Sequence, residues 1–251
     1  MTLRLEIQGA TAHLLIDRAA KRNAFDLAMW KALPPLLEQA AADPGLRLLV
    51  LRAAEPGAFC AGADIGELLA NKDDAGWRAA NQSAINAAQF ALTRFHLPTI
   101  AFVDGDCVGG GCGLALACDM RVASPRARFG ITPAKLGLVY PLHDVKLLTD
   151  LVGPGQARRM LYTGSLIDAD EGLRIGLVEA LDEDIAQFAE PILAASPHST
   201  REIKRFVRRV LDGQAEDDAE TLAVFAEAFT GPDFLEGTSA FVVKRKPEFR
   251  R

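Results

Sequence analysis

Three consecutive glycines, Gly109–Gly111, have the clearest chemical potential in this 251-residue sequence. They follow Thr99–Val103, which has the length of a buried strand, and precede Cys112–Cys118, a run of small apolar residues typical of a helix packed on all sides. Glycine lets a ligand approach the backbone closely, and the first turn of a helix carries unpaired N–H groups at the positive end of its dipole. The turn could therefore bind an oxygen that carries or develops negative charge.

Two other interpretations of this turn stay open. A glycine-rich turn between a strand and a helix can bind a dinucleotide, but the GxGxxG spacing is absent and the turn lies far from the first βα unit. The glycines could also serve only tight packing. A second turn favours the oxygen site, because Phe59–Ile65 is also rich in small residues and also follows a short apolar run, Leu46–Leu51. Two such turns could each supply one N–H to a single oxygen.

Both turns resemble signatures of the crotonase, or enoyl-CoA hydratase/isomerase, superfamily. Further similar segments extend the resemblance over nearly the whole chain: Lys21–Ala24, Leu136–Leu138, Gly155–Ala157, Ala169–Val178 and Glu236–Pro247. The resemblance implies an α/β fold built as a crotonase-type spiral of ββα repeats. It also implies a coenzyme A (CoA) thioester as substrate, with no separate cofactor and no metal.

In this family an oxyanion hole holds the thioester oxygen, and the resemblance assigns its two N–H donors to Ala61 and Gly110. An enolate oxygen carries charge that the ground state lacks, so fixed donors favour the transition state. The resemblance also implies a set of CoA-binding residues, namely Lys21, Arg22, Ala24, Ala63, Asp64, Ile65, Phe241 and Lys244. The last two are expected near the nucleotide end of CoA, where a neighbouring subunit could supply them, because the family usually forms a homotrimer or a dimer of trimers.

The sequence departs from the family where hydratases carry two catalytic glutamates. Gly113 stands at the first position, and Pro133 stands at the second, four residues after Phe129. Neither residue can transfer a proton. Hydration needs one positioned group to activate water and another to deliver a proton, so efficient hydration is not expected.

Tyr140, His143 and Asp144 are the candidate catalytic side chains that remain. The segment around Tyr140 partly resembles the methylmalonyl-CoA decarboxylase branch, although that branch has a histidine where this chain has Ala63. Loss of CO₂ generates an enolate without a base, so we predict decarboxylase-like chemistry. Each candidate also has a structural interpretation: an apolar wall for Tyr140, a helix surface for His143 and a helix cap for Asp144.

Other functions stay open as hypotheses. The chain could be an enoyl-CoA hydratase or isomerase with displaced acid–base residues, or it could bind acyl-CoA without turnover. A Clp-type serine peptidase, which shares the superfold, needs a nucleophilic serine near the oxyanion turn, and Gly105–Cys118 contains none.

Composition sets broader limits on function. A formal charge of −5 argues against a protein that mainly binds nucleic acid, and the basic segment Arg201–Arg209 is expected to form a solvated helix packed through its apolar side. The sequence has no apolar run long enough for a membrane span and no signal peptide, so we expect a cytoplasmic protein. Its four cysteines lack metal-ligand spacing and are expected to be buried, reduced thiols.

The elements that must position these residues follow from hydrophobic periodicity. Asp26 is expected to cap a helix from Leu27 to Ala42, and a second long helix is expected over Trp77–Phe95. Strand-like and helical runs alternate in the first half, whereas helical runs dominate from Gly155 onward. We therefore expect an α/β core over residues 1–195 and a helical C-terminal subregion over residues 196–251.

Overall fold

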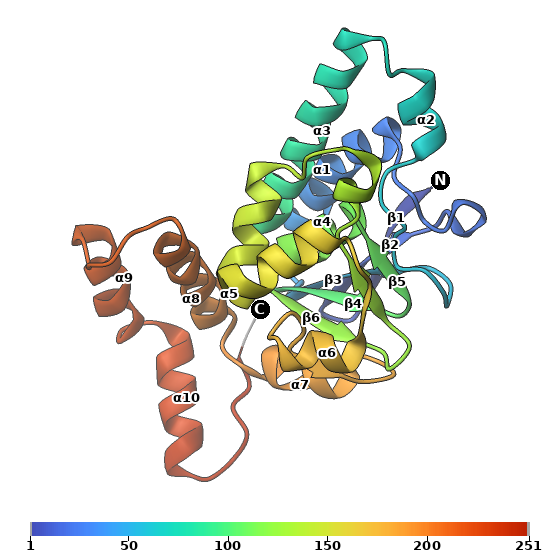
Figure 1. Cartoon of the computed structure of the whole chain (residues 1–251). Coiled ribbons are helices and arrows are strands. Elements are labelled where there is room, and N and C mark those ends of the chain that lie inside the picture. The colour runs from blue at the N-terminus through green and yellow to red at the C-terminus, as the bar shows by residue number, and fades with distance from the viewer. Residues whose placement is uncertain (1, 250–251) are drawn as a thin grey trace.

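The computed structural model describes residues 2–249 and contains two β-sheets covered by helices (Figure 1). The strands are β1 (Leu3–Gln8), β2 (Thr11–Ile16), β3 (Leu48–Ala53), β4 (Thr99–Val103), β5 (Asp106–Val108), β6 (Met120–Ala123), β7 (Arg128–Gly130), β8 (Ile167–Asp168) and β9 (Ala180–Leu181). The helices are α1 (Leu27–Ala41), α2 (Ile65–Ala70), α3 (Ala75–Thr93), α4 (Gly110–Ala117), α5 (Leu142–Thr163), α6 (Ala169–Arg174), α7 (Ala186–Ala194), α8 (Pro197–Leu211), α9 (Ala219–Ala228) and α10 (Pro232–Val242), with short 3₁₀ helices η1 (Ala19–Lys21) and η2 (Pro133–Leu136).

The sheets are built by successive ββα units. The larger sheet has the order β1-β2-β3-β4-β6-β9, and all its neighbours after the β1–β2 hairpin are parallel. In each unit the first strand joins the larger sheet and the second joins the smaller sheet, whose order is β5-β7-β8. Thus β4 is followed by β5 and α4, and β6 is followed by β7 and η2. Cys60 extends the same pattern to β3, because it forms a parallel bridge with Cys107 of β5.

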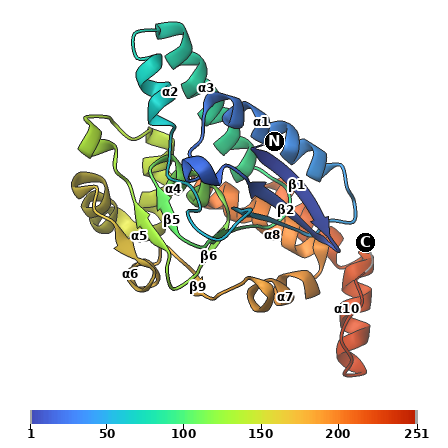
Figure 2. The ribbon, with the colours of Figure 1, turned by 90° about the vertical axis from the view of Figure 1, so that its right-hand side faces the viewer.

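The central strands are apolar on both faces because both faces are covered. Leu49 and Leu51 of β3 join the core cluster under α1, α3 and α4, whereas Leu48 and Val50 face the opposite side, where α7 packs (Figure 2). This two-sided burial explains the continuous apolar runs in the sequence. The Asp26 side chain accepts a hydrogen bond from Met29 N at 2.9 Å, which confirms the predicted cap.

The four cysteines are all buried and unpaired, as expected. Burial raises the pKa of the Cys60 thiol to about 12, which makes it a poor nucleophile at neutral pH. Within residues 2–249 no helix has the length and hydropathy that crossing a membrane would require.

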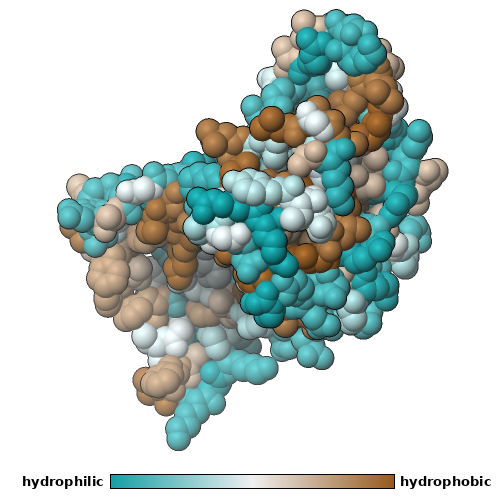
Figure 3. All heavy atoms as spheres, viewed as in Figure 1, coloured by the Kyte–Doolittle hydropathy of each residue, from teal (hydrophilic) through white to brown (hydrophobic). Residues whose placement is uncertain are grey.

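The C-terminal helices α9 and α10 extend away from the two sheets, whereas α8 lies closer to the core (Figure 1). The expected orientation of α8 is wrong, because Lys204 points inward and donates to Leu97 O at 2.8 Å, while Ile203 and Val207 are 60% and 54% exposed. Large exposed apolar side chains also gather on α9, on α10 and just after the end of α9 (Figure 3): Leu222, Phe225, Phe229, Phe234, Leu235 and Phe241.

Candidate active site

The two small-residue turns pack directly against each other. Gly62 has a φ of 98°, and a Cβ at this position would lie 2.9 Å from Val108 O and 3.4 Å from Gly110 N. A Cβ at Gly110 would lie 3.8 Å from Ala63 N. The second turn begins at Gly109, whose φ of 53° and ψ of −117° favour glycine. These contacts bring the backbone nitrogens of Ala63 and Gly110 close to each other.

The Ala61 N–H is not available for the role that the sequence predicts for it. It donates a hydrogen bond of 3.0 Å to the Arg22 carbonyl oxygen, which ties the first turn to the segment after η1. On either side of Ala63, Gly62 O accepts from Phe25 N and Asp64 N donates to Phe25 O, both at 2.8 Å, whereas no described residue accepts from Ala63 N. The structure thus corrects the predicted donor at the first turn.

Gly110 is the first residue of α4, so its N–H belongs to the helix turn that lacks intrahelical partners. No acceptor for this N–H is found in the described part of the chain. The α4 residues Gly111–Ala117 are all buried, so this helix end is fixed by packing along nearly its whole length. Fixed N–H donors of this kind need no reorganisation when charge develops on a bound oxygen.

Three polar side chains fill the space beside Gly113, where the family glutamate would project. A Cβ at Gly113 would lie 2.4 Å from Gln89 Nε2, 3.1 Å from Asp144 Oδ1 and 3.3 Å from Tyr140 Oη. Gln89 comes from α3, Tyr140 from the segment before α5, and Asp144 from the first turn of α5. The Asp144 carboxyl of α5 therefore lies beside the position from which a glutamate side chain of α4 would project.

Asp144 is buried and is not the cap of α5. The N-cap position is Pro141, and Asp144 itself is only 1% exposed. Its Oδ1 atom has no hydrogen-bond partner within residues 2–249. Burial raises the pKa of the Asp144 carboxyl to about 7, an effect that the neighbouring Gln89 amide opposes. A carboxyl with this pKa can both accept and return a proton near neutral pH.

Tyr140 and His143 differ in their burial and in their contacts with the glycine turn. The buried Tyr140 hydroxyl donates a 3.0 Å hydrogen bond to Gly109 O, and burial together with the nearby Asp144 raises the pKa of the phenol well above 10. His143 is half-buried, and burial together with the charges of Arg208 and Lys146 lowers the pKa of its imidazole. Tyr140 is thus bonded directly to the glycine turn, whereas His143 is not among the three side chains nearest to the Cβ position of Gly113.

The predicted CoA-binding residues fall into two groups. Lys21, Arg22 and Ala24 lie beside the first turn, because Phe25 forms a parallel bridge with Ala63. The Arg18 guanidinium joins this group by donating to Ala24 O at 2.7 Å and pairing with Asp64 at 2.9 Å.

Asp64 also caps α2 by accepting from Gly66 N, and Ile65 at the start of this helix is exposed. Burial alone would raise the pKa of Asp64, but the Glu67 N–H and the Arg18 guanidinium hold it below its usual value. Phe241 and Lys244, in contrast, lie at the end of α10, far from α2 in both ribbon views (Figures 1 and 2). This chain does not bring them to its own first turn.

Gln89 and Arg18 are site residues that the sequence reasoning missed. Gln89 has a recognisable signal, since it is a polar residue within the small apolar stripe of α3 that includes Ala84 and Ala88, and it is fully buried. Arg18 precedes the family-like segment and has no comparable local signal.

Comparisons with known proteins agree with this architecture. A family profile described as enoyl-CoA hydratase/isomerase matches residues 6–251. The crystal structure of an enoyl-CoA hydratase/isomerase family protein from Hyphomonas neptunium superposes with a TM-score of 0.94, at 37% identity, and the match covers 100% of this chain and 98% of that one. The predicted crotonase-type fold is thereby confirmed.

Two curated relatives are similar over nearly their full length. Crotonyl-CoA hydratase from Syntrophomonas wolfei is 32% identical, with 98% of this chain and 96% of the relative covered. (E)-Benzylidenesuccinyl-CoA hydratase from Thauera aromatica is 30% identical, with 100% and 99% covered. These matches give no support to the predicted resemblance to the methylmalonyl-CoA decarboxylase branch. They favour the alternative of a hydratase or isomerase with displaced acid–base residues.

Proposed function

Because the chain belongs to the enoyl-CoA hydratase/isomerase family, we propose that it transfers a proton on an enoyl-CoA thioester. In this proposal the N–H groups of Ala63 and Gly110 hold the thioester oxygen, and the Asp144 carboxylate carries the proton. The contact that supports it most directly is the 3.1 Å approach of Asp144 Oδ1 to the Cβ position of Gly113. The displaced carboxylate replaces the family glutamate in space, although it comes from another helix.

A single proton carrier suits double-bond isomerisation. Asp144 would take a proton from C2 of a 3-enoyl-CoA, the electrons would move onto the thioester oxygen as a dienolate, and the same carboxyl would return the proton to C4. The double bond then lies between C2 and C3, and no atom is gained or lost. The two N–H donors stabilise the dienolate oxygen, and a carboxyl whose pKa is about 7 serves both proton transfers.

Hydration is the second candidate, and the relatives named crotonyl-CoA hydratase and (E)-benzylidenesuccinyl-CoA hydratase favour it. Here Asp144 would activate the water and also supply the proton to C2, since Pro133 offers no second carboxylate. Because Asp144 alone would activate the water and deliver the proton, hydration should be slower than in an enzyme with two glutamates. Each positioned group contributes about 10²–10⁴ in rate.

The test compares three reactions on one preparation of the protein: isomerisation of trans-3-hexenoyl-CoA, hydration of crotonyl-CoA and CO₂ release from methylmalonyl-CoA. We expect isomerisation to have the highest kcat/KM, and we expect Asp144→Asn to lower it by about 10²–10⁴. Asp144→Glu serves as the control that keeps a carboxyl group. Turnover that is unaffected by Asp144→Asn, or CO₂ release as the fastest reaction, would contradict the proposal.

We also propose that the CoA site is completed between subunits of a homotrimer or a dimer of trimers. Lys21, Arg22, Ala24, Asp64 and Ile65 of one chain would bind CoA together with Phe241 and Lys244 of the next. Phe241 is 85% exposed and the neighbouring Val242 is 77% exposed, as expected for side chains that another chain covers. Light scattering should give a mass of three or six chains, and Phe241→Asp should weaken both assembly and CoA binding. A stable monomer that binds CoA normally would refute this arrangement.

A further inference from the structure

Asp106 places a buried carboxylate at the start of β5, where it pairs with two arginines. Its side chain is 10% exposed, and Arg128 of β7 donates to it through Nε at 2.7 Å and through Nη2 at 3.0 Å. The Arg22 guanidinium pairs with the same carboxylate from a segment 84 positions earlier in the chain. Because both arginine side chains are more than half exposed, the buried carboxylate limits where their guanidinium groups can lie.

The segment that carries Arg22 has a backbone conformation that L-residues rarely adopt. Arg22 has a φ of 51° and Asn23 a φ of 59°, so two successive non-glycine residues lie in the left-handed region. Such a conformation persists only where the surrounding structure holds it. The Asn23 side chain donates to Ala58 O at 2.7 Å and accepts from Arg18 N at 2.9 Å, which holds one of the two residues. Asp106 holds the other through the Arg22 guanidinium.

This ion pair is connected to the first turn by two backbone hydrogen bonds. The carbonyl oxygen of Asp106 accepts from Cys60 N, and that of Arg22 accepts from Ala61 N, both at 3.0 Å. Successive N–H groups of the turn are therefore bonded to Asp106 itself and to the residue that its side chain holds. Because the left-handed backbone of Arg22 sets the direction of its carbonyl group, the ion pair fixes Ala61, two residues before the Ala63 donor.

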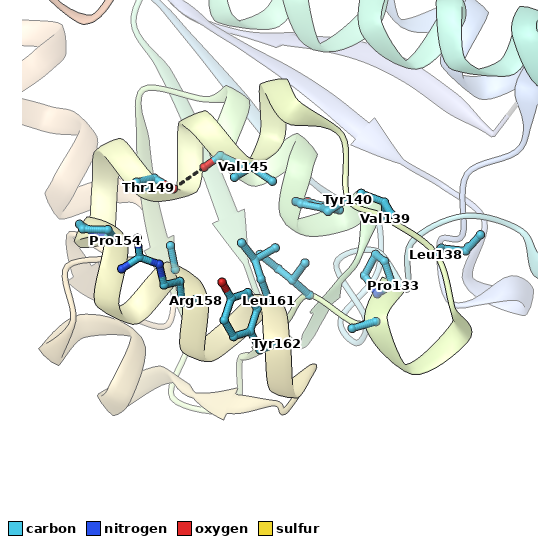
Figure 4. Close-up of a pocket in the computed structure, with 13 residues that line it drawn as sticks. Pro133, Leu138, Val139, Tyr140, Val145, Thr149, Pro154, Arg158, Leu161 and Tyr162 are labelled. Carbon is cyan, nitrogen blue, oxygen red and sulfur yellow. Dashed lines mark hydrogen bonds between the residues drawn. The ribbon is translucent and has the colours of Figure 1, made fainter.

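The second turn has anchors that do not involve the Asp106 side chain. Gly109 N donates to Gly130 O at 2.8 Å, and Gly109 O accepts from the Tyr140 hydroxyl. The Tyr140 ring is held in turn in the wall of an apolar cavity, which Val145 of α5 also lines (Figure 4). A change in the Asp106 side chain should therefore displace the first turn relative to the second.

We propose that Asp106 is a positioning residue of the oxyanion hole, which acts through Arg22 to hold the Ala63 N–H at the thioester oxygen. The inference rests on the proposed function, because it assumes that this oxygen lies between Ala63 and Gly110. Displacing one donor lowers the rate even though no group that transfers a proton has changed, and a displacement of about 1 Å can cost about 10²-fold. An ion pair that only stabilised the fold would affect unfolding and leave kcat unchanged.

Kinetics of Asp106→Ala test the proposal, because this variant removes both acceptor oxygens while the exposed arginines remain solvated. We expect kcat to fall by about tenfold to 10²-fold. Arg128→Gln is the matched control, since it removes the other arginine but keeps the pair of Asp106 with Arg22, and it should leave kcat nearly unchanged. Asp106→Asn keeps the shape of the side chain and provides the same test if Asp106→Ala fails to fold.

A double-mutant cycle shows whether Asp106 acts through Arg22. Arg22→Gln alone should lower kcat, and adding Asp106→Ala to it should cause no further loss, because the side chain that Asp106 holds is already gone. Residues that contribute independently would instead give additive losses.

A binding measurement separates the inference from the proposed reaction. Butyryl-CoA labelled with ¹³C at C1 has no double bond to isomerise or hydrate, and its carbonyl infrared band moves to lower frequency as the oxygen accepts stronger hydrogen bonds. We expect this low-frequency band in the unmodified protein and in Arg128→Gln. In Asp106→Ala the band should move back toward the frequency of the free thioester.

Each outcome decides the inference. A kcat and a carbonyl band that are unchanged in Asp106→Ala, or additive losses in the double variant, would overturn it while leaving the proposed function intact. An unshifted band in the unmodified protein would overturn both, because no oxyanion hole would then hold the thioester. If only the proposed reaction is wrong, the band still responds to Asp106→Ala, whereas enoyl-CoA turnover does not depend on Asp144.

Discussion

The Tyr140 hydroxyl donates a 3.0 Å hydrogen bond to the carbonyl oxygen of Gly109. This bond joins the segment before α5 to the turn that carries the Gly110 N–H. Because the phenol is buried and its pKa is raised well above 10, Tyr140 stays protonated and keeps donating across the physiological range. Its position therefore stabilises the geometry of the turn and does not require Tyr140 to give up its proton.

Replacing Tyr140 with Phe tests this positioning role. The variant keeps the ring that lines the apolar cavity but loses the bond to Gly109 O, so the free energy of unfolding should fall by about 1 kcal/mol. Loss of the bond should loosen the turn, so we expect kcat to fall about threefold to tenfold with KM little changed. Urea denaturation and steady-state kinetics measure the two effects. Loss of activity at the level of Asp144→Asn would instead identify Tyr140 as a proton carrier.

The pH dependence of the rate should report the ionisation of Asp144. Burial raises the pKa of this carboxyl to about 7, and a base acts in its deprotonated form. The value of kcat/KM should therefore rise about tenfold per pH unit below pH 6 and level off above pH 8. A profile that is flat between pH 5 and 8 would contradict the role of Asp144 as base.

Because the pKa of Asp144 is raised, its ionised carboxylate lowers the free energy of unfolding at high pH. A carboxyl whose folded pKa is raised from 3.8 to about 7 favours the folded state below pH 4, and this contribution is lost progressively as the pH rises from about 4 to about 7. Asp144→Asn carries no charge at any pH, so it should be more stable than the unmodified protein at pH 8. The gap should be at least about 1 kcal/mol, since one pKa unit corresponds to about 1.4 kcal/mol.

The difference in unfolding free energy between the two proteins should grow from pH 4 to pH 7 and then stay constant. Urea denaturation of both proteins at pH 5 and pH 8 measures this difference. The contributions of the other titrating groups are the same in both proteins and therefore cancel. An Asp144→Asn variant that is less stable than the unmodified protein at pH 8 would show that the ionised carboxylate is well solvated.

Gly110 offers a clean test of the oxyanion hole. As the first residue of α4 it tolerates proline, whose ring removes the N–H without breaking an intrahelical bond. Gly110→Pro should lower kcat by about 10²–10³, the usual loss for one donor. Gly110→Ala is the control, because it adds a Cβ that would lie 3.4 Å from the Trp30 ring but keeps the N–H. Equal activities of the two variants would mean that the N–H is not used.

Sequence reasoning succeeded where the governing signal is local. The apolar runs of β3 and β4, the Asp26 cap and the two glycine-containing turns are each encoded within a few residues, and the structure contains all of them. The role predicted for Ala61 did not hold because its N–H partner, Arg22 O, lies far away in the chain. The orientation of α8 was wrong for a similar reason, since Lys204 is drawn inward by Leu97 O and by Asp119, neither of which is near it in sequence.

At Gly113 the missing side chain of α4 does not leave the volume beside it without a carboxyl group. An alignment compares positions along the chain, whereas a reaction depends on which atoms occupy a volume, and the volume beside Gly113 is filled from two other helices and the segment before α5. A larger residue at position 113 would collide with Gln89 and Asp144 while these side chains are present. Restoring the family glutamate at position 113 without other changes would therefore disrupt the packing of Gln89 and Asp144.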